Sequence, residues 1–226
     1  MGINKGGEKM KYSAHSTYYN KEGEEVPSVT TVLKILNKPF LQKWANIMGF
    51  KRQKIEDILE KSSIIGTMVH KLIEAYLMEK MYVFIPARHH TRTLAMTYMN
   101  TFINWKHTHV LKPEFMEKSH SSDKFGGTID FYGVVDGLHT ILDFKTSKKF
   151  YATMFLQLAA YCIMLEEHGK KVEQAAIIII NEGGYNEKFI TREELEPYIQ
   201  TFKKLVDFFH VWYNLNIDEG WGDILA

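Results

Sequence analysis

Three residues near the middle of the chain have the types and spacing of a hydrolytic metal site. Asp143 and Lys145 are two apart in the segment HTILDFK, and Asp130 ends the preceding segment GGTID. Side chains two apart on a strand point to the same face, so a strand over residues 138–145 presents the acid and the amine together. Counting back from the Asp-Gly turn between the segments places Asp130 beside Asp143. Two such carboxylates repel each other unless a cation binds between them, and oxygen ligands suit Mg²⁺ or Mn²⁺.

An Asp and a Lys two apart are also typical of a solvated strand face or a surface ion pair, so other motifs must support the site. His70 and Glu74 lie one helical turn apart in GTMVHKLIEAYLMEK, which we place at or near a helix start. Gln157 and Tyr161 have the same spacing just after the strand that bears Asp143. Each of these pairs, taken singly, is common on ordinary helices.

Hydrophobic periodicity predicts the elements that position these residues. A hairpin is predicted around the turn KEGEE, with Ser28 and Thr191 as helix N-caps. The Asp-Gly pair at 136–137 predicts a tight hairpin turn. The predicted helices cover residues 29–36, 40–59, 66–80, 91–109, 152–168 and 192–216. The predicted strands cover residues 114–120, 127–136, 138–145, 175–181 and 185–190.

Composition places the chain among ordinary globular proteins. It has 226 residues, of which 45% are hydrophobic and 24% charged, with a formal net charge of +1. A nucleic-acid binder with this balance must concentrate its positive charge locally. The single Cys162 excludes an intramolecular disulfide and is expected to be a buried core thiol. No apolar run approaches the roughly 20 residues of a membrane helix, and no secretory signal is evident, so a reducing, cytoplasmic compartment is expected.

Five motifs in order resemble one nuclease family. The series GTMVH, a glutamate, GGTID, DFKTSK and QLAAY is similar to the RecB-like exonuclease branch of the PD-(D/E)XK superfamily. The opening VPSVTTVLKIL, followed by Trp44, resembles the phage exonucleases and the mitochondrial genome-maintenance exonuclease of that branch. The resemblance spans about residues 26–165. Members with an iron–sulfur cluster use four cysteines, so a chain with one cysteine is expected to lack it.

The resemblance implies a role for each motif residue. Asp130 and Asp143 would bind the metal, together with His70 and the backbone carbonyl of Phe144. Lys145 would be the catalytic lysine. Gln157 and Tyr161 would contact the DNA phosphate or brace Lys145. For the upstream acid, the spacing favours Glu117 over Glu114, with a solvated strand residue as the alternative. One or two ions are compatible with this set, with Glu117 or Glu74 near a second ion.

The resemblance also implies the fold and the DNA contacts. The expected fold is α/β, with a restriction-endonuclease-like core in which helices flank a mixed central sheet, and an N-terminal helical elaboration. One nuclease domain is expected over 1–226, divided into a hairpin and helical arch or wall (12–110), a catalytic sheet core (111–190) and a C-terminal helix (191–216). The candidate DNA-binding residues are Ser28, Thr30, Trp44, Arg92, Lys148 and Lys149, and beyond these Tyr18, Lys51, Arg52, Lys54 and Arg88.

The function expected from the sequence is a Mg²⁺- or Mn²⁺-dependent deoxyribonuclease that acts as an exonuclease on single-stranded DNA or DNA ends, in replication, recombination or repair. The alternatives are an endonuclease of the same superfamily and a DNA-binding module without catalysis. The chain has no GxxxxGK[ST] loop, which argues against a nucleotide-driven motor. The expected partners are DNA and replication or recombination proteins, with no membrane. The expected setting is a bacterial or phage-infected cytoplasm rather than a mitochondrion.

Overall fold

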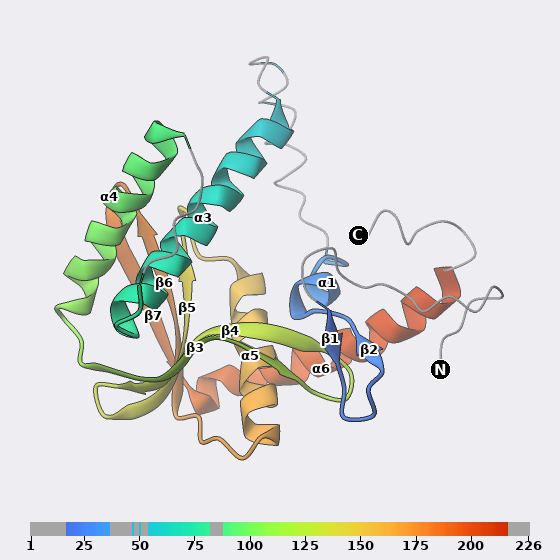
Figure 1. Ribbon diagram of the computed structural model, residues 1–226. Helices are drawn as coiled ribbons and strands as arrows, with labels where there is room; N and C mark the ends of the chain where they lie inside the picture. The colour runs from blue at the N-terminus through green and yellow to red at the C-terminus, as the bar shows by residue number, and fades with distance from the viewer. Residues whose placement is uncertain (1–16, 37–46, 48–49, 51–53, 82–87, 217–226) are drawn as a thin grey trace.

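A computed structural model of the chain describes residues 17–36, 47, 50, 54–81 and 88–216. Within these residues a five-stranded mixed sheet has helices on both faces (Figure 1). This arrangement confirms the predicted α/β fold with its mixed central sheet and N-terminal helices. The division of the chain at residues 110 and 190 stays a prediction. None of the described helices combines the length and apolar character that a membrane crossing requires.

The sheet has the strand order β3-β4-β5-β6-β7, and only β5 and β6 run parallel. The helix α5 (Ala152–Glu167) forms the crossover between these two strands, as parallel neighbours require. The strands are β3 (Leu111–Ser121), β4 (Gly126–Val135), β5 (Leu138–Lys145), β6 (Gln174–Asn181) and β7 (Gly184–Thr191).

The remaining elements precede or follow the sheet in the chain. A small antiparallel hairpin and a short helix come first, and a long helix ends the described chain. These elements are β1 (Tyr18–Tyr19), β2 (Glu25–Val26), α1 (Val29–Leu33), α3 (Ile55–Leu77), α4 (His89–Lys106) and α6 (Arg192–Asn216).

Local signals in the sequence set several boundaries. Ser28 accepts a hydrogen bond from the Thr31 N–H at 3.0 Å and so caps α1, as predicted. Thr191 Oγ1 accepts from the Glu194 N–H, and Glu194 accepts from the Thr191 N–H, which makes a reciprocal capping box at the start of α6. Asp136 and Gly137 both have positive φ, as a tight hairpin turn between β4 and β5 needs.

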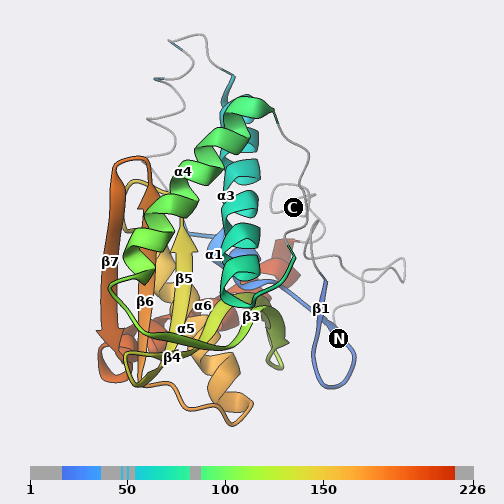
Figure 2. The same cartoon turned by 60° about the vertical axis from the view of Figure 1, so that its left-hand side comes forward.

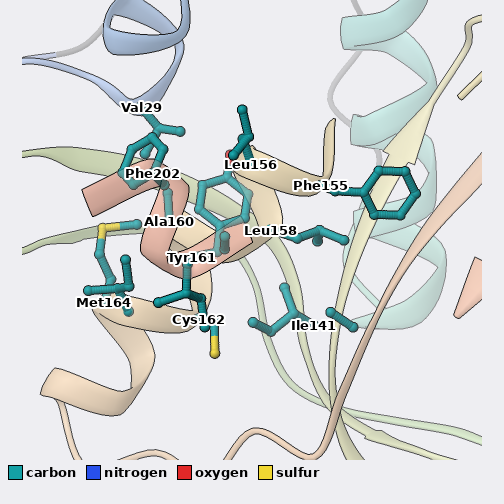
Figure 3. Close-up of a cluster of buried hydrophobic side chains, with 14 of the residues drawn as sticks. Val29, Ile141, Phe155, Leu156, Leu158, Ala160, Tyr161, Cys162, Met164 and Phe202 are labelled. Atoms are coloured by element: carbon teal, nitrogen blue, oxygen red, sulfur yellow. The ribbon is translucent and has the colours of Figure 1, made fainter. Parts of the chain in front are cut away.

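Alternation along β6 divides the core into two layers. Ala175, Ile177 and Ile179 point to the face covered by α1, α5 and α6, where Cys162 is fully buried among apolar side chains (Figure 3). This burial confirms the predicted core thiol, and it raises the pKa of the Cys162 thiol to about 12. The alternate residues Ala176 and Ile178 point to the opposite face, where α3 and α4 pack (Figure 2). The sheet is therefore covered on both sides, as its continuous apolar strand predicted.

Two helix boundaries were predicted wrongly. The helix predicted over 40–59 does not end at residue 59, and Gly66 does not begin a helix, because both positions lie inside the 23-residue helix α3. The sequence before Gly66, IEDILEKSSII, contains no residue that breaks a helix, so the helix runs through the glycine. His70 is therefore held deep within a continuous helix, whose position is fixed by apolar residues such as Val69 and Ile73 in the α3–α4 layer.

Candidate active site

The candidate site lies where β4 separates from β5. The pairing of these strands runs from Val135 and Leu138 to Phe131 and Leu142. Beyond Phe131 and Leu142 the backbone pairing of β4 with β5 ends. There the backbone N–H of Phe144 donates to the side chain of Asp130 at 2.9 Å. The prediction that Asp130 lies beside the strand of Asp143 is therefore confirmed. Residues from both faces of the sheet can meet at this opening.

Three potential metal ligands from three elements converge there. His70 of α3, Glu117 of β3 and Asp130 of β4 bring one ligand atom each within 4.8 Å of one another. His70 Nδ1 lies 3.1 Å from Glu117 Oε1 and 3.5 Å from Asp130 Oδ2. One imidazole nitrogen with two carboxylates is a donor set suited to a divalent cation such as Mn²⁺, whereas Mg²⁺ prefers oxygen ligands.

The second ring nitrogen of His70 fixes the orientation of the imidazole. Nε2 lies 2.9 Å from the carbonyl oxygen of Phe144, which can only accept, so Nε2 carries a hydrogen and Nδ1 faces the carboxylates. Metal-binding histidines in proteins commonly donate their other nitrogen in this way. The Phe144 carbonyl, predicted to face the metal, is thus engaged by His70. Burial alone would lower the pKa of His70, but the charges of Asp130 and Glu117 outweigh it and raise the pKa to about 9.

An irregularity in β3 brings Glu117 to the site. The register with β4 shifts between Pro113 and Phe115, and Glu117 has a left-handed φ of 47°. This conformation costs about 1–2 kcal/mol for a residue with a side chain and is typical of functional positions. Glu114, the other acid considered from spacing, is exposed and pairs with Lys170. Glu117 is therefore the upstream acid that lies among the other potential ligands.

Asp143 and Lys145 form a pair beside this trio. Lys145 Nζ lies 2.9 Å from Oδ1 and 2.7 Å from Oδ2 of Asp143, but only the contact with Oδ1 has hydrogen-bond geometry. Among the described residues, Oδ2 is thus a fully buried carboxylate oxygen without a hydrogen bond. The ammonium pairs with the charge of this oxygen, and the lone pairs that accept no hydrogen bond are available to a cation or an ordered water. Burial raises the pKa of Asp143 to about 6, although the charge of Lys145 opposes the shift.

Two residues of α5 hold the lysine. Gln157 Oε1 accepts a hydrogen bond from Lys145 Nζ at 3.1 Å, and Gln157 Nε2 donates to the Tyr161 hydroxyl at 2.6 Å. Burial raises the pKa of Tyr161 well above its ordinary range, so the hydroxyl stays neutral. An ammonium group has three hydrogens, and Asp143 and Gln157 use two of them. One N–H of Lys145 is left for a water or a phosphate oxygen.

The predicted DNA-binding residues are more scattered. Lys148 and Lys149 are exposed in the segment between β5 and α5, directly after the site lysine. Thr30 is exposed in α1, whereas Ser28 is buried and bonded within the cap. Arg92 lies exposed in the first turn of α4. Trp44 lies outside the described residues, as do Lys51 and Arg52, whereas Lys54 and Arg88 are exposed.

Two further expectations need correction. Tyr18 was a candidate DNA-binding residue, but it is only 9% exposed, so its ring face is not available for stacking on a base. Glu74 was considered for a second ion, but its carboxylate pairs with Lys71 and Lys80, each at 3.1 Å. The prediction also missed two hydroxyl residues next to the ligands, Thr128 on β4 and Ser119 on β3. The alternation GGTID, which puts Thr128 on the same side of its strand as Asp130, was the signal that could have found the first.

Comparisons with known proteins give only distant similarity. No protein-family model matches the sequence, and no curated protein matches it. Among solved structures, the crystal structure of LHK-Exo in complex with dAMP is similar over 73% of this chain and 90% of that one, with 10% identity and a TM-score of 0.39. The crystal structure of SSO0001 is similar over 54% of this chain and 61% of that one, with 11% identity and a TM-score of 0.30. At these scores neither likeness says which reaction the chain performs.

Proposed function

We propose that this chain is a metal-dependent deoxyribonuclease of the PD-(D/E)XK superfamily, RecB-like branch, and that it acts as an exonuclease on single-stranded DNA or DNA ends. One observation supports this above all others. A histidine and two carboxylates, His70, Glu117 and Asp130, converge within 4.8 Å beside the ion pair of buried Asp143 and half-buried Lys145. The five residues come from four elements, so chance local clustering in the sequence does not explain their meeting.

The ligand set fits a divalent cation, because the donor atoms are close together and a buried carboxylate oxygen lacks a hydrogen bond. Mn²⁺ or Mg²⁺ would be held by His70, Glu117 and Asp130, with Asp143 close by. A bound cation would lower the pKa of a water ligand and stabilise negative charge on the phosphate under attack.

The side chains around this position have separate tasks. Lys145 directs its remaining N–H at the attacking water or at a non-bridging phosphate oxygen. Gln157 fixes the position of Lys145, and Tyr161 fixes the position of Gln157. His70 is oriented by the Phe144 carbonyl, so that Nδ1 faces the carboxylates before any cation binds. This preorganisation limits the rearrangement that the reaction requires.

The helices beside the site favour an exonuclease over an endonuclease. The helices α3 and α4 cover one face of the sheet, and α3 projects beyond the ends of the strands (Figures 1 and 2). His70 lies on this helix and reaches the opening between β4 and β5. Helices on one side of the site, here α3 and α4, restrict the approach of a continuous duplex more than the approach of a free DNA end. Replication, recombination and repair are processes that generate such ends.

The test uses end-labelled linear single- and double-stranded DNA and circular single-stranded DNA, in Mn²⁺, in Mg²⁺ and in EDTA. We expect metal-dependent loss of linear DNA with circles left intact, and the position of the label that is released first gives the polarity. The variants Asp130→Asn and Lys145→Ala should lose cleavage but still bind DNA. Cleavage of circles would favour the endonuclease instead. If folded wild-type protein binds DNA but cleaves none of these substrates, the nuclease function is refuted and the chain is a DNA-binding module.

A further inference from the structure

Three hydroxyl groups form a connected cluster next to the site. The Tyr18 hydroxyl lies 3.0 Å from Thr128 Oγ1, and Ser119 Oγ lies 3.1 Å from the same Thr128 oxygen. Tyr18 comes from the N-terminal hairpin, whereas Ser119 and Thr128 are directly opposite each other on β3 and β4. We call Tyr18, Ser119 and Thr128 the hydroxyl triad.

The triad lies on the same side of the sheet as the ligand trio. A side chain at Gly127 would meet Tyr161 of α5 at 3.0 Å, so residue 127 faces α5 and Thr128 faces away from it. Thr128 is two residues before Asp130 on β4, and Ser119 is two residues after Glu117 on β3. Along β4, two residues of extended strand span about 6.8 Å, a distance comparable to one nucleotide of an extended single strand.

The position of the tyrosine hydroxyl is fixed by packing. A side chain at Gly126 would overlap the Cβ of Tyr18, so this glycine allows the ring to lie directly against β4. The ring is 9% exposed, while Thr128 is half-buried and Ser119 is exposed. The hydroxyls are therefore held in place at the edge of solvent, and a ligand does not have to order them.

Counting hydrogens shows that the triad has donor capacity left. Three hydroxyls supply three hydrogens, and the two bonds within the triad use two of them. At least one O–H of the triad can therefore donate to a group outside it, such as an anionic oxygen. Because the hydroxyls are uncharged, they do not compete with the carboxylates of Glu117 and Asp130 for a cation. We propose that the hydroxyl triad binds the phosphate of the nucleotide next to the one that is cleaved. This inference rests on the proposed nuclease function.

The test removes hydroxyls while preserving shape. In a Lys145→Ala background with Mn²⁺, the dissociation constant of a short single-stranded oligonucleotide is measured for the added substitutions Thr128→Val and Tyr18→Phe. Each is expected to weaken binding about tenfold, as for the loss of a hydrogen bond to a charged group. The matched control is Tyr19→Phe, which removes the hydroxyl of the neighbouring, 54% exposed tyrosine and should leave the constant unchanged.

Oligonucleotides with one methylphosphonate, moved along the strand, identify the contact. At one position the neutral linkage should weaken binding by the background protein about tenfold, and Thr128→Val should add no further loss there. Equal losses from Thr128→Val at every position, or unchanged dissociation constants with a lowered Tm, would show that the triad only fastens the hairpin to the sheet. Wild-type protein that neither binds nor cleaves DNA would refute the nuclease function itself, whereas cleavage by wild type with unaffected triad variants would refute only this subsite.

Discussion

The substitution Gly66→Ala tests the course of the helix that brings His70 to the site. Gly66 lies inside α3, and no positive φ requires a glycine there. Among the residues that the structure describes, a Cβ at this position would meet only Thr146 Oγ1, at 3.8 Å, which is an ordinary van der Waals contact. Alanine is favoured over glycine inside a helix by about 0.8–1.0 kcal/mol, chiefly because glycine loses more backbone entropy on folding. The variant should therefore be more stable than wild type by about 1 kcal/mol.

If a helix instead began at Gly66, the substitution should lower the stability, because alanine is a poorer N-cap than glycine. Thermal unfolding followed by circular dichroism separates the two cases. A gain of about 1 kcal/mol raises the Tm of a protein of this size by about 2–4 °C. The control is Gly169→Ala at a φ of 73°, where a side chain is strained and the Tm should fall. A Tm for Gly66→Ala that equals or falls below that of wild type would refute the continuous helix.

The same substitution has a consequence for the proposed activity. Gly66 lies one helical turn before His70, and the nearest atom to its added methyl belongs to the residue after Lys145. The methyl would therefore narrow the space between α3 and the segment that follows β5. We expect Gly66→Ala to cleave DNA more slowly than wild type although it unfolds at a higher temperature. Cleavage at the wild-type rate or faster would refute this expectation.

Three other predictions concern the α6 cap, the lysine brace and a surface histidine. Thr191→Ala should lower stability by about 1 kcal/mol in denaturant unfolding because it breaks the capping box, and an unchanged midpoint would contradict that role. Gln157→Leu should lower kcat about tenfold with little change in KM, because Lys145 loses its brace; an effect confined to KM would instead make Gln157 a substrate contact. Burial would lower the pKa of His109, but its hydrogen bonds to Asp136 and Glu187 raise it. Protonated His109 should therefore stabilise the folded state fully below about pH 6.5, and this stabilisation should be lost as the pH rises through the raised pKa. His109→Gln should flatten this part of the stability–pH curve, and an unchanged curve would refute the assignment.

Local patterns in the sequence were enough for the sheet and its caps. The Asp-Gly turn and the period of two set the β4–β5 register, and with it the neighbourhood of Asp130 and Asp143. Hydroxyl residues before apolar periodic segments marked the helix starts at Ser28 and Thr191. The continuous apolar run at 175–181 indicated a strand covered on both faces. Each of these features depends on residues close in sequence, whose spacing already fixes their relative direction.

The tertiary structure shows why Glu117, and not Glu114, lies at the site. The two acids are three residues apart in one strand; the motif spacing favoured Glu117, but it did not show which of them faces His70. The irregular backbone of β3 turns Glu117 toward His70, while Glu114 pairs with Lys170 on the surface. A bulge redirects side chains without changing composition or periodicity, so the sequence contained no clear signal of it.

The amino-acid sequence by itself determined which residues share a strand or a helix face, and it supplied the chemistry of the site in Asp130, Asp143 and Lys145. Only the tertiary structure decided that His70 meets Glu117, that the Phe144 carbonyl orients this histidine, and that Tyr18 reaches Thr128. These contacts join residues 47, 74 and 110 positions apart in the chain. Their geometry depends on how α3 and the N-terminal hairpin pack against the sheet, which periodicity within one element does not specify.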